Sequence, residues 1–255
     1  MTEPIRLRRL IPECGETTLA ESIDSLDLAT LAPADRPYVI TNFAITLDGH
    51  STIRGKSGAI GSNADTAMLI GLRTRVDAVM VGAETMRVER YGRAVGDPAK
   101  RQRRERDGLA HDPLVVIVSG RFELPWDAPL FTDGGGRVLI FTCSDEAPPE
   151  TATPVRVIRH DGDEVDLAAA LSYLRRERGV RTLLCEGGAR THAQLIDGAL
   201  VDEMFVTHAP KLGGGVGPGL VSGLAELERP VRVEWLLTDH ATGELFARYL
   251  VPALT

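Results

Sequence analysis

A carboxylate, two glycines and the start of a helix follow one another in the stretch LLCEGGARTHAQLI, residues 183–196. Residues 181–185 are typical of a buried strand, and the pattern becomes helical after Glu186-Gly187-Gly188. Glycine lets a ligand approach the backbone closely. The first N–H groups of a helix have no partner, and the helix dipole favours negative charge beside them. The stretch therefore predicts a binding site for an anion such as a pyrophosphate.

A second glycine-rich loop, Lys211 to Gly219, follows the predicted strand that ends near Ala209. It lacks the spacing G-x-G-x-x-G of the Rossmann dinucleotide fold, because Pro218 stands where the third glycine would fall. A Walker-type phosphate loop is absent from the sequence as well. One alternative is that the glycines only make tight turns. Two such loops at the carboxyl ends of predicted strands favour a ligand site, because α/β proteins bind ligands there.

The elements that would position these loops alternate between strands and helices along most of the chain. Residues 63–75 are expected to form a helix with Asn63 as its N-cap, and residues 84–112 a long polar loop. The chain ends in a predicted hairpin with Ala241-Thr242-Gly243 as its turn. The other strands are expected at 38–47, 77–82, 113–119, 137–142, 155–159, 181–185 and 201–212, and the other helices at 166–179 and 189–200.

This order predicts an α/β fold, with a mostly parallel central sheet flanked by helices and an antiparallel C-terminal hairpin. Residues 1–36 contain three prolines and a short amphipathic run, and are expected to be an N-terminal extension that packs on the rest rather than a core element. No internal repeat or linker interrupts the remainder, so residues 37–255 are expected to form one domain.

Composition restricts the classes of function. The 255 residues are 43% apolar and 25% charged, as in a soluble globular enzyme, and the net charge of −7 argues against a nucleic-acid partner. The basic run KRQRRER at 100–106 is expected to form a solvated face. Cys14, Cys143 and Cys185 lie too far apart for a zinc motif or a disulfide framework. No signal peptide or membrane span is recognisable, so a cytoplasmic location is expected.

Five stretches occur together in one order: 42–49 (NFAITLDG), 56–86 (KSGAIGSNADTAMLIGLRTRVDAVMVGAETM), 113–120 (PLVVIVSG), 183–196 and 201–215 (VDEMFVTHAPKLGGG). Together they resemble the reductase domain of riboflavin biosynthesis, over about residues 37–251. The resemblance implies a dihydrofolate-reductase-like fold and the NADPH-dependent reduction of a phosphoribosylamino-pyrimidine to its ribitylamino product. The HAE and PCxxC-type motifs of the family's zinc deaminase domain are absent, so a stand-alone reductase without a metal is expected.

The resemblance also implies a set of cofactor-binding residues. Ala44 would lie against the nicotinamide through its backbone, Ser119 would approach the adenosine, and Arg121 would hold the 2′-phosphate of NADPH. The segment from Gly187 to Ala193 would hold the pyrophosphate, and Glu89 occupies a position where the family commonly has Asp. The complete set is Ala44, Ala59, Thr85, Glu89, Ser119, Arg121, Gly187, Gly188, Ala189, Arg190 and Thr191.

On the substrate side, the resemblance implies Ser57, Arg73, Arg93 and Glu186. Arg73 would bind the phosphate or the polar ring, and the carboxylate of Glu186 would accept hydrogen bonds from ring amino groups. Asp48 and Glu186 are the candidate catalytic acids, with water as the alternative proton source. Asp48 has a second reading as a cap of the Leu-Asp-Gly turn. His50 and His192 are expected to be structural or solvated.

The segment 88–112 departs from the family's usual pattern, and it would shape the substrate pocket. A pterin is also a flat, amino-rich ring that NADPH reduces on the same fold. The alternatives are therefore a dihydrofolate or pterin reductase, or a non-catalytic paralogue that binds NADPH without turnover. The partner is expected to be a small phosphorylated pyrimidine or a pterin-like molecule, and the resemblance implies a homodimer.

Overall fold

The structure, a computed structural model, describes residues 4–215, 217–221 and 228–252. Within these ranges, eleven strands form one sheet, accompanied by seven α-helices and a short 3-10 helix. The strands are β1 (Arg6–Ile11), β2 (Gly15–Thr18), β3 (Tyr38–Thr46), β4 (Ala78–Gly82), β5 (Leu114–Val118), β6 (Arg137–Thr142), β7 (Val155–Arg159), β8 (Thr182–Cys185), β9 (Glu203–Ala209), β10 (Arg232–Thr238) and β11 (Leu245–Leu250). The helices are α1 (Leu19–Asp24), η1 (Ala29–Leu31), α2 (Asn63–Arg73), α3 (Ala83–Glu89), α4 (Pro98–Arg106), α5 (Pro129–Thr132), α6 (Leu167–Arg178) and α7 (Ala189–Asp197).

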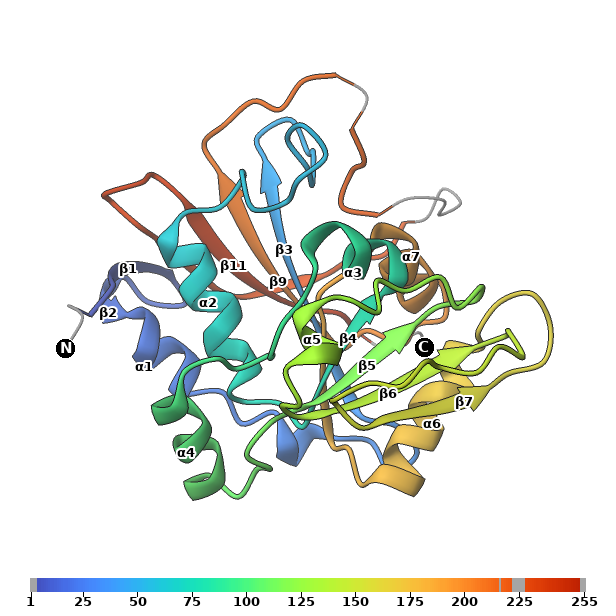
Figure 1. Cartoon of the computed structure of the whole chain (residues 1–255). Coiled ribbons are helices and arrows are strands. Elements are labelled where there is room, and N and C mark those ends of the chain that lie inside the picture. The colour runs from blue at the N-terminus through green and yellow to red at the C-terminus, as the bar shows by residue number, and fades with distance from the viewer. Residues whose placement is uncertain (1–3, 216, 222–227, 253–255) are drawn as a thin grey trace.

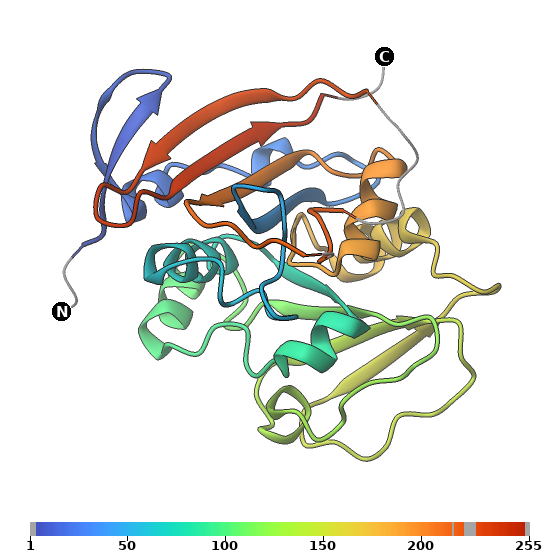
Figure 2. The same ribbon diagram turned by 90° about the horizontal axis from the view of Figure 1, so that it is seen from above.

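The strand order is β2-β1-β10-β11-β9-β3-β8-β4-β5-β6-β7. From β9 through β7 every neighbouring pair is parallel. The pairs between β9 and β2 are all antiparallel, including the β10–β11 hairpin. Figure 2 shows this antiparallel group along one edge of the molecule, with β5, β6 and β7 at the other. The predicted fold class, a mostly parallel sheet with an antiparallel C-terminal hairpin, is confirmed.

Helices cover both faces of the sheet (Figure 1). Alternate residues of a strand point to opposite faces. In β4, Val79 and Val81 belong to the buried cluster that includes α1 and α2, whereas Ala78 and Met80 belong to the cluster that includes α6 and α7. Strands covered on both sides read as continuous apolar runs, which is why β4, β5 and β6 are recognisable in the sequence.

The predicted helix caps are partly right. The side chain of Asp166 accepts a hydrogen bond from the backbone N–H of Ala169 at the start of α6, and Gly179 ends this helix with φ +66°. The prediction of Asn63 as the N-cap of α2 is wrong by one residue. Ser62 is the cap, because its hydroxyl accepts from the N–H of Ala64, and the helix ends at Arg73 rather than 75.

The predicted polar loop at 84–112 is wrong, since this segment contains most of α3 and all of α4. The prediction of a solvated basic face at 100–106 also fails at Arg104, which is completely buried. Its guanidinium donates to the backbone carbonyls of Arg73 and Val76 at 2.7 and 2.8 Å, and to that of Ala110 at 3.0 Å. Arg73 is the last residue of α2 and Val76 lies three residues after it, so Arg104 satisfies carbonyls that the end of this helix leaves open.

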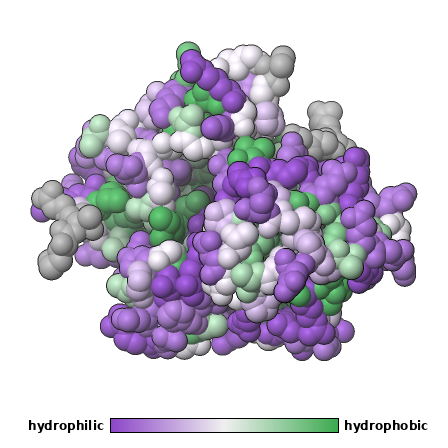
Figure 3. Space-filling model, viewed as in Figure 1, coloured by the Kyte–Doolittle hydropathy of each residue, from purple (hydrophilic) through white to green (hydrophobic). Residues whose placement is uncertain are grey.

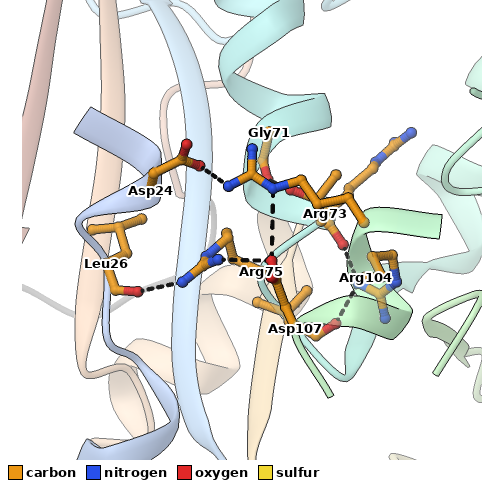
Figure 4. Close-up of polar contacts among 10 residues, drawn as sticks. Asp24, Leu26, Gly71, Arg73, Arg75, Arg104 and Asp107 are labelled. Atoms are coloured by element: carbon orange, nitrogen blue, oxygen red, sulfur yellow. Dashed lines mark hydrogen bonds and ion pairs between the residues drawn. The ribbon is translucent and has the colours of Figure 1, made fainter. Parts of the chain in front are cut away.

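Neighbouring arginines strengthen the same junction (Figure 4). Arg103 pairs with Asp24 at the end of α1, and Arg75 pairs with Asp107 while donating to the carbonyl of Leu26. The basic run therefore ties α4 to α1 and to the end of α2, which positions the α2 wall of the site described below.

Residues before β3 are part of the sheet and of the core. β1 pairs with β10, and Leu7, Leu19 and Ile23 belong to the buried cluster on the α2 side. The expectation that residues 1–36 contribute no core element is therefore wrong. The hydrophobic residues of β1 and α1 alternate too irregularly for their burial to be read from the sequence. The domain boundary after residue 36 stays a prediction.

Candidate active site

A cleft opens where β3 separates from β8. The β3–β8 ladder ends at the pair Thr41 and Cys185, whereas the β3–β9 ladder continues to Thr46 and Ala209. Beyond Thr41, therefore, one side of β3 has no strand beside it within the described residues, and a cleft of about 920 Å³ occupies this position. Parallel strands present their carboxyl ends here, which is where α/β proteins bind ligands. In the view of Figure 3, apolar surface gathers near the middle of the face, between hydrophilic regions.

Glu186, Gly187 and Gly188 connect β8 to α7 along this cleft. Gly187 has φ +120°, a backbone conformation that favours glycine. The loop also packs closely on β4: Gly82 donates its N–H to the carbonyl of Gly187 at 2.7 Å, and a Cβ on Gly82 would lie 2.8 Å from Oγ1 of Thr191. Glycine is therefore required at both places for physical reasons.

The N-terminus of α7 faces the cleft through Gly188, Ala189 and Arg190. Among the residues that the structure describes, no side chain caps this helix, and its first turn carries no acid. Open N–H groups and the helix dipole favour an anion at such a position, and the expected anion site stays a prediction. Arg190 adds a positive charge and pairs with Glu164.

Across the cleft, Arg73 and Glu186 form a bidentate ion pair. Nε and Nη2 of Arg73 donate to Oε1 and Oε2 of Glu186, each at 2.6 Å, and Nη1 donates to the carbonyl of Ala94 at 3.0 Å. The side chain of Glu186 is only 2% exposed and that of Arg73 14%. Burial alone would lower the pKa of Arg73, but the Glu186 carboxylate raises it overall, so the guanidinium stays charged.

Tyr91 completes this cluster. Its hydroxyl donates to Oε2 of Glu186 at 2.9 Å, and the Arg73 guanidinium lies 5.4 Å from the centre of its ring. Burial, and then the negative charge of Glu186, raises the pKa of Tyr91 well above its ordinary value, so the hydroxyl remains a donor. Glu186 therefore accepts three hydrogen bonds from the protein itself, and most of its acceptor capacity is already used.

Eleven of the predicted site residues line the cleft, and five do not. Those that line it are Ala44, Ser57, Arg73, Thr85, Glu89, Arg93, Glu186, Gly187, Gly188, Ala189 and Arg190. Ser57 donates to Glu89 at 2.6 Å, which links the loop after β3 to α3. Arg93 is paired with Asp112 through two hydrogen bonds of 2.8 and 2.5 Å. The residues outside the lining are Asp48, Ala59, Ser119, Arg121 and Thr191.

Asp48 acts as a loop cap. Its carboxylate accepts hydrogen bonds from Oγ1 of Thr46 at 2.6 Å and from the N–H groups of Gly213 and Gly214 at 2.9 and 2.8 Å. These donors, the Thr46 hydroxyl first, hold the pKa of Asp48 well below its usual range, so it carries no proton to give at neutral pH. The geometry favours its turn-capping role, in which Asp48 binds the N–H groups of Gly213 and Gly214 from the second glycine-rich loop.

Ala59, Ser119 and Arg121 also lie outside the lining of the cleft. The carbonyl of Ala59 accepts from Nζ of Lys211 at 3.1 Å. Ser119 follows the last residue of β5, and that residue, Val118, pairs with Gly82 of β4. Ser119 and Arg121 both follow β5, the strand beside β4. Ser119 is buried and Arg121 is exposed.

Tyr91 and Asp65 are among the residues that line the cleft but were not predicted from the sequence as site residues. Tyr91 falls in the segment expected to be a polar loop, where no periodic pattern marks it. Asp65 could have been found, because it precedes Leu69 and Arg73 by four and eight residues on one helix face. His192 also lines the cleft, but burial lowers its pKa to about 4, and its ring packs 4.0 Å from that of Phe43. It is a neutral packing residue, as expected.

Two kinds of feature are absent from the described residues. No helix among them is long and apolar enough to cross a bilayer. No group of three His, Cys, Asp or Glu side chains within those ranges is arranged to hold a metal ion.

Comparisons with known proteins agree with this architecture. A sequence-family profile described as the RibD C-terminal domain matches residues 37–242. A 2,5-diamino-6-ribosylamino-4(3H)-pyrimidinone 5′-phosphate reductase from Archaeoglobus fulgidus is 34% identical over 83% of this chain and 96% of its own length. A protein of the same name from Methanothermobacter thermautotrophicus is 30% identical over 85% of this chain and 99% of its own.

Among solved structures, a pyrimidine reductase-like protein from Corynebacterium diphtheriae shares the fold with a TM-score of 0.78 and 24% identity, over 93% of this chain and 100% of that one. A deaminase and 5-amino-6-(5-phosphoribosylamino)uracil reductase from Thermotoga maritima matches with a TM-score of 0.67 and 22% identity, over 85% of this chain and 57% of its own. The fold, the position of the cleft and the profile match lead to one conclusion: the chain belongs to the family of the RibD C-terminal domain.

Proposed function

We propose that this protein is an NADPH-dependent reductase of the riboflavin-biosynthesis type, which reduces the ribosylamino group of a phosphoribosylamino-pyrimidine to a ribitylamino group. The observation that carries the proposal is the shared position of two features in one cleft: the uncapped start of α7, and the buried Arg73–Glu186–Tyr91 cluster. The start of α7 suits a dinucleotide. The Arg73–Glu186–Tyr91 cluster lies where a polar substrate would meet that dinucleotide.

The residues present fit a nicotinamide dinucleotide. The pyrophosphate would be held by Gly187, Gly188 and the N–H groups of Ala189, Arg190 and Thr191, because these groups are open and no acid lies in the first turn. The fit is close: a Cβ on Gly188 would lie 3.0 Å from Oγ1 of Thr85. Ala44, on the exposed side of β3, leaves room for a flat ring. Ser119 and Arg121 would meet the adenosine and its 2′-phosphate, which is the basis for proposing NADPH rather than NADH.

When bound, the cofactor supplies a hydride to carbon C1′ of the ring-opened ribosylamino group, and a proton completes the reduction. The task of the chain's residues is to position the two partners and exclude water. Arg73 and Arg93 bring two positive charges to the cleft, which suits the substrate phosphate, although each is already paired with a carboxylate. Glu89 and Ser57 would contact the ribosyl chain through the hydroxyl–carboxylate pair that they form.

Neither carboxylate considered for proton donation is suited to it. The bidentate pair with Arg73 keeps Glu186 as an acceptor, and the pKa of Asp48 is held too low for proton donation. We therefore favour water held in the cleft over either carboxylate. Glu186 would then act as a positioning residue that fixes Arg73. The remaining lone pair of its Oε1 atom would accept a hydrogen bond from a ring amino group. A cytoplasmic location and a homodimer stay predictions.

The test is NADPH oxidation by the purified protein, followed as absorbance loss with three additions: the 2,5-diamino-ribosylamino-pyrimidinone phosphate, its 2-oxo counterpart, and dihydrofolate. Oxidation with either pyrimidine supports the proposal. Oxidation with dihydrofolate alone supports the pterin reductase instead. Binding of NADPH without oxidation in any of the three mixtures would leave the non-catalytic paralogue as the remaining account.

A further inference from the structure

Arg190, in the first turn of α7, is held by a carboxylate from another segment. A guanidinium nitrogen of Arg190 donates to Oε1 of Glu164, and the side-chain amide of Gln194 donates to Oε2 of the same carboxylate at 2.9 Å. Gln194 follows Arg190 by four residues, which is about one helical turn. The Glu164 carboxylate therefore lies beside both turns. It directs the Arg190 side chain towards Gln194, away from the first N–H groups of the helix.

The backbone around Glu164 is well anchored, whereas its side chain is exposed. Val165, the next residue, is 6% exposed and belongs to the buried cluster that includes α6 and α7. Asp166 caps the start of α6 by accepting from the N–H of Ala169. By contrast, the side chains of Glu164 and Arg190 are 55% and 72% exposed. Glu164 thus stays beside α7, while water can take the place of either partner in the ion pair.

A pyrophosphate would be a stronger partner for Arg190 than Glu164 is. An ion pair between exposed side chains is weak, because water screens both charges. A pyrophosphate bridge carries two negative charges, and at the start of α7 it would also meet the open N–H groups of the helix. After such an exchange, Glu164 would keep the amide of Gln194 and gain water as a partner. The contact between Arg190 and Glu164 is therefore one that a bound dinucleotide can replace.

We propose that Glu164 is a positioning residue that competes with the cofactor for Arg190, and so lowers the affinity of the cleft for a dinucleotide. This rests on the proposed function, in that the start of α7 is taken as the pyrophosphate site. In the free protein Arg190 pairs with Glu164, and in the complex it turns to the pyrophosphate. Binding therefore includes the breaking of an ion pair, which makes a bound dinucleotide easier to release.

Other acids lie in the same loop as Glu164, between β7 and α6. Burial, and then the charges of Asp163, Glu164 and Asp161, raise the pKa of the nearby Cys143 thiol. A Cβ on Gly120 would lie 3.4 Å from the carbonyl of Asp163, so this loop packs beside the end of β5. Competition for Arg190 therefore has to be distinguished from a general repulsion of anions by the loop.

The first measurement is the affinity for NADPH, by fluorescence titration at low ionic strength. Glu164→Gln keeps the size of the side chain and removes its charge, so NADPH should bind about two- to fivefold more tightly, the range of an exposed ion pair. Asp161→Asn is the matched control, because it removes one charge from the same loop and leaves the Arg190–Glu164 pair in place. Its affinity should change by less than about 1.5-fold. Unchanged affinity in Glu164→Gln, or an equal gain in Asp161→Asn, would overturn the proposal.

Removal of Arg190 gives the sharpest comparison. In a protein that already carries Arg190→Gln, Glu164→Gln should change NADPH affinity by less than about 1.5-fold, because the contested group is gone. A purely structural role of Glu164 would not produce this dependence on Arg190. Circular dichroism checks that each variant is folded, and Glu164→Ser serves in the same comparison if the Gln variant is not. A gain in affinity that persists without Arg190 would show direct repulsion, and would overturn the role assigned to Glu164.

NADH shares the pyrophosphate with NADPH but lacks the 2′-phosphate. Competition at the pyrophosphate predicts the same gain in affinity for both dinucleotides in Glu164→Gln. A gain for NADPH alone would place Glu164 beside the 2′-phosphate and contradict the proposal. The gain should also shrink as the salt concentration rises from about 0.02 M to about 0.5 M, because salt screens exposed charges. A gain that does not depend on salt would argue against an ion pair as its cause.

Turnover with the pyrimidine phosphates separates this proposal from the proposed function. Oxidation of NADPH, together with equal affinities in the wild type and Glu164→Gln, would overturn the role of Glu164 alone. Tighter binding to Glu164→Gln without oxidation by any pyrimidine would overturn the proposed reductase and leave the competition for Arg190 in place. A folded wild-type protein that binds no NADPH would overturn both.

Discussion

The guanidinium of Arg73 and the carboxylate of Glu186 are joined by two hydrogen bonds of 2.6 Å, which connect α2 to the glycine loop across the cleft. This ion pair changes the role expected of Glu186. From the sequence, it is a free acceptor for ring amino groups. In the structure, it is 2% exposed and held by Arg73 and Tyr91, so its first effect is to fix the arginine.

Glu186→Gln should reduce kcat/KM for the pyrimidine substrate by about tenfold or more, because a buried guanidinium loses its partner and its fixed position. The free energy of unfolding should fall by about 3 kcal/mol for the same reason. NADPH affinity should change by less than about threefold, since backbone N–H donors, not the Glu186 side chain, would hold the pyrophosphate. Steady-state kinetics, urea unfolding and fluorescence titration measure the three effects.

Tyr91→Phe is the graded control for this variant, because it removes one hydrogen bond to Glu186 and keeps the ring beside Arg73. Tyr91→Phe should lower the free energy of unfolding by about half as much as Glu186→Gln, or less. If Glu186→Gln turned over as well as the wild type, the positioning role of the pair would be wrong.

Gly187→Val should weaken NADPH binding by at least about tenfold. The wild-type φ of +120° is strongly disfavoured for a β-branched residue, and the new side chain would occupy the cleft beside the start of α7. Fluorescence titration with NADPH measures the change. Gly96→Ala is the matched control, because a Cβ there meets no atom within 4 Å, and its affinity should equal that of the wild type. Unchanged NADPH binding in Gly187→Val would argue against the proposed cofactor position.

The burial of His192 predicts a dependence of stability on pH. Burial lowers its pKa to about 4, below the ordinary value of 6.5, so the unfolded chain binds the proton more readily than the folded one. The stabilisation is fully present above about pH 6.5 and is lost as the pH falls towards 4, by up to about 3 kcal/mol. His192→Gln, which keeps a donor for the carbonyl of Cys185, should flatten the curve of Tm against pH in this window. An equally steep curve in the variant would show that another group is responsible.

Arg104→Met should lower the free energy of unfolding by about 3 kcal/mol or more, because it leaves the carbonyls of Arg73 and Val76 buried without their donor. The adjacent Arg103→Met removes a half-exposed pair with Asp24 and should cost less than about 1 kcal/mol. Urea unfolding of both variants compares them directly. Similar losses in the two variants would mean that the burial of Arg104 contributes little to the α2–α4 junction.

The sequence predicts the parallel strands and the glycine loop because their signals are local. Apolar runs such as β5, the Asp166 cap and the Gly179 stop each act within a few residues. The prediction for residues 84–112 fails because the structure of this segment depends on contacts that are distant in the sequence. Its arginines are polar at every position, and only contacts with α1 and α2 decide that Arg104 is buried while Arg103 is half exposed.

The candidate site likewise combines features that local sequence predicts with features that only distant contacts decide. The position of Glu186 beside the glycines is visible in the sequence, but its pairing with Arg73 joins residues 113 positions apart and depends on how α2 crosses the sheet. Asp48 shows that residue type alone cannot separate a catalytic acid from a loop cap: the hydrogen bonds from Gly213 and Gly214 decide it, and these come from a loop distant in sequence.

The most direct test of the central claim is to follow the hydride itself. Purified protein is incubated with the 2,5-diamino-ribosylamino-pyrimidinone phosphate and NADPH that carries deuterium at nicotinamide C4 on the transferred side, and the products are analysed by mass spectrometry. The account predicts NADP⁺ and a ribitylamino product with one deuterium at C1′. NADPH left unoxidised, or a pyrimidine recovered without the label, would contradict it.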